Sequence, residues 1–220
     1  MLSSLKRGLL ALGVATTVVA VGAATASAAT TWTVTAGTTA SGSTTFTAST
    51  TGTSPQIHFS DLVTGGALTC ASGTAKGTVP HLGSGLSNPL ANITGSTWAT
   101  CTGPFGLNLA VSQPTTSVWT LNGDSYNATT GVTSGHISNV TANVTSIPAG
   151  SCSFTVSGAV TGTYTNSTHV LAVANSGTTY ALTISAVSGC FGVVGNGHAA
   201  SFTANYNVTT PLGALTVTSP

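Results

Sequence analysis

Apolar and polar residues alternate with a period of two along most of this chain, and amphipathic helical spacing hardly occurs. The clearest alternating runs cover residues 32–36, 107–111, 152–156, 180–186 and 200–208. A period of two places apolar side chains on one face of a β-strand and polar side chains on the other. These runs therefore predict strands with one buried face.

The segment 137–147 is ambiguous, because Ile137, Val140, Val144 and Ile147 also fall at helical spacing. It is rich in Val and Thr, whose branched Cβ atoms favour strands over helices. We predict a strand here as well.

Turn-forming residues separate the alternating runs. They occur at Gly65-Gly66, Asn122-Gly123-Asp124, Thr130-Gly131, Pro148-Ala149-Gly150 and Ser176-Gly177. About ten or more short strands with regular turn signals predict an all-β fold, an antiparallel β-sandwich or barrel. We expect the least regular stretch, Gly77 to Asn92, to form a long loop. No linker divides the chain, so residues 29–220 are predicted to form a single domain.

The N-terminus has the features of a signal peptide. Lys6 and Arg7 precede an apolar run from Leu9 to Val21, and Ala26-Ser27-Ala28 resembles a cleavage site. We expect residues 1–28 to be removed and the mature protein to be secreted, extracellular or associated with the cell wall. No later stretch reaches the roughly 18 apolar residues of a transmembrane helix.

Charged residues make up 2% of the 220 residues, against about 25% in a typical soluble domain. Without residues 1–28 the charged side chains are Asp61, Lys76 and Asp124. Binding to nucleic acid or to an anionic membrane surface requires clustered Lys or Arg. The composition therefore argues against both partners.

The four cysteines are Cys70, Cys101, Cys152 and Cys190. An even number in an exported chain predicts two disulfides, for which three connectivities exist. We favour Cys70–Cys101 and Cys152–Cys190, because the sequence around the two pairs is loosely duplicated. The spacing of a zinc site is missing, and we expect neither a metal nor another cofactor.

Catalytic chemistry finds little support in the sequence. Paired-carboxylate hydrolysis needs two acidic groups, and the mature chain offers only Asp61 and Asp124. We interpret Asp61 as a cap of a loop or strand end, and Asp124 as a cap of the Asn122-Gly123 turn. The scattered histidines are interpreted as solvated strand or loop residues: His58, His81, His136, His169 and His198. We predict that the protein is not an enzyme. An unrecognised hydrolase with a Ser-His-Asp arrangement is the alternative, because a triad is defined by its geometry and not by spacing in the sequence.

Several segments together resemble a known group of sequences. They are Thr69-Cys70, 101–107, 119–122, 126–131, 162–168 and Gly189-Cys190, in a chain rich in Thr, Gly and Ser. Their layout is similar to a family of uncharacterised secreted, four-cysteine β proteins of actinomycete bacteria. The resemblance implies export and an all-β architecture, and it implies no site.

The leading functional hypothesis is a secreted, non-catalytic protein of the cell surface or extracellular space that is structural or self-associating. Its partner would be a second copy or a neutral cell-surface polymer. The alternative is a binding module for a carbohydrate or a small apolar molecule, with candidate contacts at Trp98, Trp119, Tyr126 and Phe105. An envelope channel is a weaker alternative.

Overall fold

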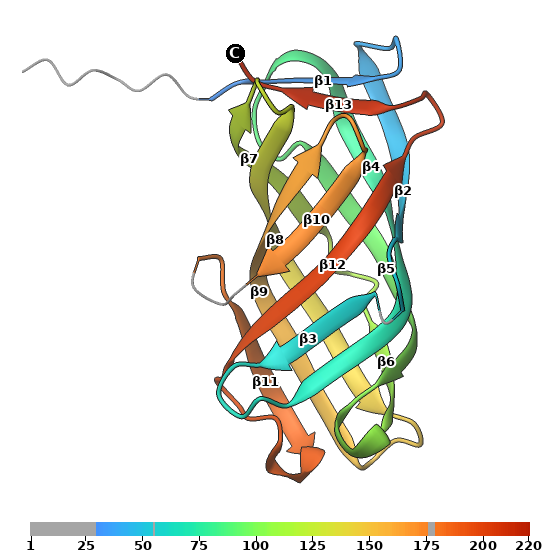
Figure 1. Ribbon diagram of the computed structural model, residues 1–220, viewed down its shortest axis with the longest axis vertical. Helices are drawn as coiled ribbons and strands as arrows, with labels where there is room; N and C mark the ends of the chain where they lie inside the picture. The colour runs from blue at the N-terminus through green and yellow to red at the C-terminus, as the bar shows by residue number, and fades with distance from the viewer. Residues whose placement is uncertain (1–29, 55, 176–178) are drawn as a thin grey trace, which may run out of the picture.

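The computed structural model describes residues 30–54, 56–175 and 179–220, and these residues form one antiparallel sheet (Figure 1). Its 13 strands are β1 (Trp32–Ala36), β2 (Gly42–Thr50), β3 (Ile57–Asp61), β4 (Ala67–Leu86), β5 (Ala91–Thr102), β6 (Asn108–Ser112), β7 (Trp119–Asn127), β8 (Val132–Ser146), β9 (Cys152–Thr165), β10 (Val170–Asn175), β11 (Leu182–Gly189), β12 (Ala199–Thr209) and β13 (Leu215–Thr218). Two 3-10 turns, η1 (Pro104–Gly106) and η2 (Cys190–Gly192), complete the elements. The predicted all-β antiparallel fold is confirmed. The predicted signal peptide and the predicted Ser176-Gly177 turn fall on residues outside the described ranges.

The hydrogen-bonded pairings return to their starting strand, so the sheet is closed, as in a barrel. Five long strands (β4, β5, β8, β9 and β12) form most of the wall. Pairs of shorter strands fill three gaps between them: β2 above β3, β7 above β6 and β10 above β11 (Figure 1). The wall is completed where β4 pairs with β5 and β8 pairs with β9.

The predicted alternation sets which side chains face the interior of the closed sheet. In β12, Ala200, Ala204 and Tyr206 are buried while Thr203 is exposed. In β8, the ambiguous segment is a strand with Val140 and Val144 buried, as predicted. The core is therefore the interior of the closed sheet, filled by the apolar rows of the surrounding strands.

The strands β1 and β13 pair with each other and cross the upper end of the closed sheet (Figure 1). We call this pair the lid. Trp32 and Val34 on β1 are each 1% exposed, and Leu215 and Val217 on β13 are also buried. The lid therefore covers the upper end of the core with apolar side chains.

Two turn predictions are wrong. The expected loop from Gly77 to Asn92 is mostly strand, because β4 continues to Leu86 and β5 begins at Ala91. The expected turn at Asn122-Gly123-Asp124 lies inside β7, where the register with β8 shifts between Gly123 and Ser125. Glycine inside a strand commonly marks a bulge or a close approach of other atoms. Here Gly123 lies against the Trp32 ring.

Both predicted disulfides are confirmed: Cys70 is bonded to Cys101 and Cys152 to Cys190. Cys70–Cys101 crosslinks β4 to β5, and Cys152–Cys190 crosslinks the start of β9 to η2, which directly follows β11. These strand ends lie toward the lower end of the sheet in Figure 1. Among the described residues, no helix is long and apolar enough to cross a membrane.

Candidate functional site

Five large apolar side chains are exposed on the loops at the lower end of the sheet, and we call this cluster the tip. Phe105 is 79% exposed, Val63 67% and Phe191 65%. The other two members are Leu62 and Ile147. Exposed large apolar residues are ordinary when scattered singly, whereas a cluster commonly marks an interaction surface.

Hydrogen bonds join the loops that carry the tip. Cys190 donates its N–H to the carbonyl of Ser151 at 2.9 Å, which brings η2 to the β8–β9 loop. Ile147 in that loop donates to the carbonyl of Asn108 at 2.8 Å, beside η1. The hydroxyl of Thr64 donates to the carbonyl of Val193 at 2.6 Å and links the β3–β4 loop to the segment after η2.

Two similar turns present the aromatic rings of the tip. Phe105 and Phe191 lie at the centres of η1 and η2 with φ values of 57° and 53°, in the left-handed region that favours glycine. Such a conformation costs about 1 to 3 kcal/mol for a residue other than glycine and is concentrated at functional sites. The rings meet edge to face with centroids 6.0 Å apart.

Each aromatic turn is tied to a disulfide. Cys190 directly precedes Phe191, and Cys101 lies at the end of β5, next to η1. The loose duplication in the sequence corresponds to this arrangement of a disulfide followed by a Phe-Gly turn. The two turns come from distant parts of the chain, and the rings are held together in a fixed orientation.

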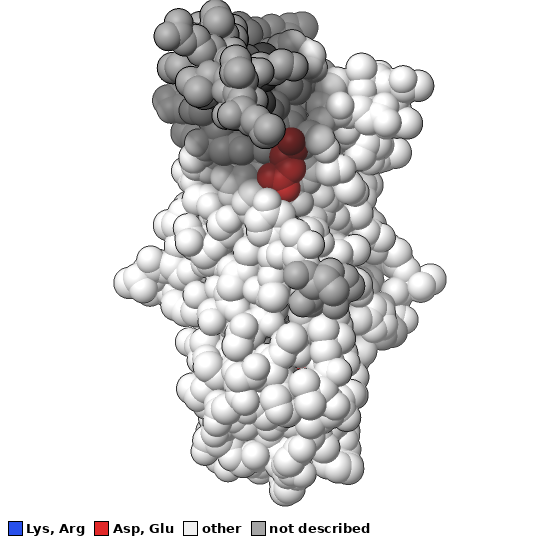
Figure 2. Space-filling model, turned by 90° about the vertical axis from the view of Figure 1, so that its left-hand side faces the viewer, with Lys and Arg blue, Asp and Glu red and all other residues white. Residues whose placement is uncertain are grey.

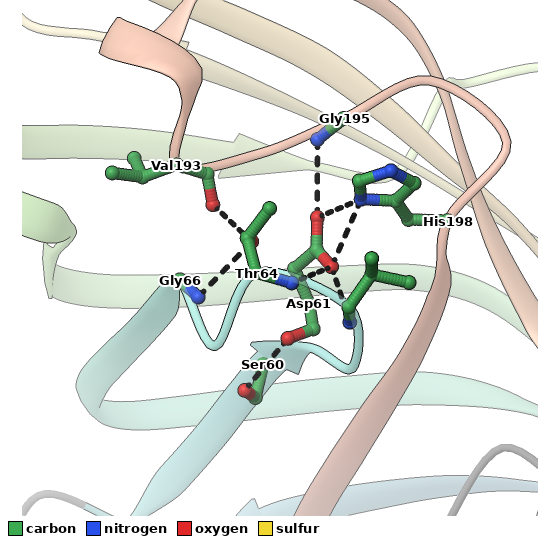
Figure 3. A network of polar contacts seen from close by, with 8 residues as sticks. Ser60, Asp61, Thr64, Gly66, Val193, Gly195 and His198 are labelled. Carbon is green, nitrogen blue, oxygen red and sulfur yellow. Dashed lines mark hydrogen bonds and ion pairs between the residues drawn. The ribbon is translucent and has the colours of Figure 1, made fainter.

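The buried carboxylate of Asp61 fixes the loops behind the tip (Figure 3). Asp61 is 0% exposed and accepts hydrogen bonds from the backbone N–H groups of Val63 at 2.8 Å, Thr64 at 3.1 Å and Gly195 at 3.0 Å. The Nδ1 atom of His198 lies 2.8 Å from the same carboxylate. The interpretation of Asp61 as a strand-end cap is therefore correct, and the structure adds the link to His198.

The charge of Asp61 is stabilised by these donors. Burial by itself raises the pKa of the Asp61 carboxyl, but the hydrogen bonds from Thr64, Val63, His198 and Gly195 outweigh that effect and lower the pKa from 3.8 to about 2. Hydrogen bonds to the ionised form favour that form. Asp61 thus stays charged inside the protein and connects the β3–β4 loop to the segment after η2.

The second aspartate forms a similar pair on the outer face of the sheet. Asp124 lies 2.9 Å from the Nδ1 atom of His136, and the ring of Tyr180 stacks on His136 with centroids 3.9 Å apart. Burial, together with the charge and the hydrogen bond of Asp124, raises the pKa of Tyr180. Asp124 therefore pairs with a histidine on the neighbouring strand, and the expectation that it caps a turn is wrong.

An Asp–His pair is also two thirds of a catalytic triad, in which the second ring nitrogen accepts a proton from a nucleophile. Among the described residues, no Ser or Thr hydroxyl is hydrogen-bonded to the Nε2 atom of His136 or of His198. The described residues also contain no cluster of three or more His, Cys, Asp or Glu side chains that could hold a metal ion.

The four predicted ligand contacts lie in three different places. Trp98 and Trp119 come together with ring centroids 6.2 Å apart, and both line an interior cavity. Tyr126 is partly buried and borders a hollow at the β7–β8 turn. Phe105 belongs to the tip. These four side chains do not form one aromatic surface for a sugar.

The surface around these features carries almost no charge. The described residues contain two aspartates and one lysine, and Asp61 is fully buried. The face drawn in Figure 2 shows one red patch in its upper part, and the lower end of that face is uncharged. Long-range electrostatic attraction cannot select a partner for the tip.

The sequence indicated Phe105 as a contact but gave no reason to expect Leu62, Val63, Ile147 and Phe191 beside it. The repeated Phe-Gly dipeptide after a cysteine was the available signal.

No protein-family model, curated protein or solved structure matches this chain. The resemblance to secreted actinomycete proteins therefore stays a prediction.

Proposed function

We propose that this protein is a secreted, non-catalytic component of the cell surface or extracellular space that self-associates through its tip. The observation that carries the proposal is the cluster of five exposed apolar side chains, of which Phe105 and Phe191 lie on turns next to the two disulfides. Burial of apolar surface is the main driving force of most protein association. A rigid surface also loses little conformational entropy when it becomes buried.

A second copy of the chain is a suitable partner for the tip. The tip contains no charged side chain, so two tips can approach without electrostatic repulsion. In a twofold dimer the same surface patch is used by both copies. The edges of Phe105 and Phe191 can then contact the rings of the other copy, an arrangement that aromatic pairs favour.

The positions of the other aromatic residues favour association over sugar binding. Trp119 is 7% exposed and Trp98 is partly buried, and both face the interior. A sugar-binding platform needs aromatic faces that solvent can reach. The role of Asp61 as a fully buried link between two loops also supports a non-catalytic protein.

The proposal is tested by multi-angle light scattering of the purified mature chain over a wide range of concentrations. The critical variant is Phe105→Asn with Phe191→Asn, because Asn tolerates the left-handed conformation of both positions. We expect the wild type to form dimers and the double variant to dissociate with a Kd at least about tenfold higher, as two central apolar contacts contribute that much.

The matched control is Val118→Asn with Leu212→Asn. These residues are 45% and 42% exposed and lie outside the tip, so the control removes comparable exposed apolar groups and should leave the Kd unchanged. Equal weakening by both double variants, or a wild type that is monomeric at every concentration, would contradict self-association through the tip.

A further inference from the structure

The interior of the closed sheet contains two cavities of about 90 Å³ each. One lies under the lid, where Val34, Leu215 and Val217 line it, and the other lies beside Trp98 and Trp119. Protein interiors rarely leave voids much larger than a water molecule. Both cavities therefore stand out as unfilled space in the core.

Three side chains separate the two cavities. Phe46, Ile137 and Leu171 line both of them, so a rotamer change in this group would join the two spaces. The combined volume of the two cavities exceeds the roughly 150 Å³ of an engineered apolar cavity that binds benzene. The interior thus has room for one small molecule.

The lining determines what kind of molecule fits. It consists almost entirely of apolar side chains. Two of the polar side chains in the upper cavity already have partners: Tyr164 donates its hydroxyl to the carbonyl of Leu215 at 2.8 Å, and Thr133 donates to the carbonyl of Val217 at 3.4 Å. A charged or strongly hydrogen-bonding molecule would lose its hydration without compensation. An uncharged hydrocarbon-like molecule has no such hydration to lose, so it fits this lining.

The strand β13 is the part of the lid that offers a route to the interior, because β1 is also paired with the wall strand β4. Among the described strands, β13 has backbone pairing with β1 alone. Side-chain bonds hold it to the rim, including the Tyr164 bond and two between Asn166 and Val217 of 2.8 and 2.9 Å. An element held by few backbone bonds opens at lower free energy than the wall strands.

We propose that the interior of the closed sheet is a binding site for one small uncharged apolar molecule, such as a single aromatic ring or a short alkyl chain, and that it enters by opening of the lid. This site is independent of the tip. Its occupancy would be reported by Trp98 and Trp119, which line the lower cavity.

Benzene is the probe, with benzoate as the charged analogue of similar shape. At ten times its Kd, benzene should raise the melting temperature of the mature chain by roughly 3 to 5 °C and change the tryptophan fluorescence saturably, whereas benzoate should do neither. An unchanged melting temperature with benzene, or an equal response to benzoate, would overturn the proposal.

Filling the cavities provides the structural control. Ala48 lines the lower cavity and Ala91 the upper one, so Ala48→Leu and Ala91→Leu should abolish the benzene response. Ala110→Leu, at an exposed position of β6, should retain it. Equal binding by filled and control variants would place benzene elsewhere and refute the site.

The lid is tested separately in the wild-type cavity. Asn166→Ala removes both side-chain bonds to Val217, so benzene should bind and dissociate faster while its Kd stays nearly constant. Unchanged rates would refute the lid as the route, and the equilibrium response to benzene would still decide whether the site exists.

Discussion

Asp61 combines complete burial with a full charge, which is costly in a protein unless hydrogen bonds replace the lost water. Three backbone N–H groups and His198 surround its carboxylate. Two of these donors, Gly195 and His198, come from the segment after η2, far from Asp61 in the sequence. The sequence could identify Asp61 as a strand-end cap, but this long-range link depends on the closed sheet.

Acid should therefore weaken the fold through Asp61. Its pKa is 3.8 ordinarily and about 2 in the folded protein, so the ionised group contributes stability above pH 4 and this contribution is lost as the pH falls through 2. We expect a loss of about 2 kcal/mol in the free energy of unfolding. Denaturant titrations of the wild type and of Asp61→Asn between pH 6 and 2 measure this loss. It appears as the difference between the two proteins in how the free energy of unfolding changes with pH.

Asp124→Asn is the matched control for this measurement. The Asp124 side chain is 37% exposed, and exposed ion pairs contribute at most about 1 kcal/mol. The control should therefore follow the wild-type pH dependence. A wild type and an Asp61→Asn variant with the same pH dependence would show that the Asp61 network adds no stability.

Phe105 and Phe191 are unfavourable residues for the backbone conformation that they adopt. Replacing Phe105 by Asn relieves the left-handed strain at φ 57°, while it removes one ring from the edge-to-face pair. Because these effects oppose each other, we expect the free energy of unfolding to change by less than about 1 kcal/mol. Thermal denaturation tests this, and a loss of several kcal/mol would show that Phe105 serves the fold rather than association.

Among the elements, the strands were the most predictable and the glycines inside them the least. Alternation identified the inward rows of β8, β9 and β12, because each strand has one face in the core. Gly77 was predicted to begin a loop and Gly123 to lie in a turn, yet each lies within a strand where other atoms leave no room for a Cβ atom. These atoms are the Asn92 carbonyl and the Phe46 ring at Gly77, and the Trp32 ring at Gly123. That relation joins distant strands, and local sequence does not reveal it.

Gly123→Ala tests the packing between the lid and β7. An added Cβ would overlap the Trp32 ring, so we expect a destabilisation of about 1 to 3 kcal/mol from overpacking. Gly95→Ala in β5 is the control, because the added Cβ meets only the flexible Lys76 side chain. Equal unfolding free energies of the two variants would contradict close contact between Trp32 and β7.

For the whole molecule, the sequence predicted an all-β fold and the two disulfides correctly, but it left sandwich and barrel unresolved. Closure depends on which strands meet, such as β4 with β5 and β12 with β2, and alternation carries no information about partners. The tip was missed for the same reason. Its residues come from separate loops that meet only when the sheet has closed.

The near absence of charge makes a prediction about the response to salt. Association through an uncharged apolar tip has no Coulomb attraction for salt to screen. Sedimentation velocity at constant protein concentration should show the same dimer fraction, or a larger one, between about 20 and 500 mM NaCl. Dissociation with added salt would mean that charged groups such as Lys76 and Asp124 hold the copies together.

If two copies of the chain meet at their tips, the dimer has a characteristic shape that distinguishes this contact from any other. The sheet is elongated and the tip lies at one end (Figure 1). Small-angle X-ray scattering of the dimer should therefore give a maximum dimension near twice that of the monomer, and Phe105→Asn with Phe191→Asn should restore the monomer dimension. Thr216→Lys, on the terminal strand β13, should leave the dimer intact. A compact, side-by-side dimer that persists in the double Phe variant and is lost in Thr216→Lys would contradict the account.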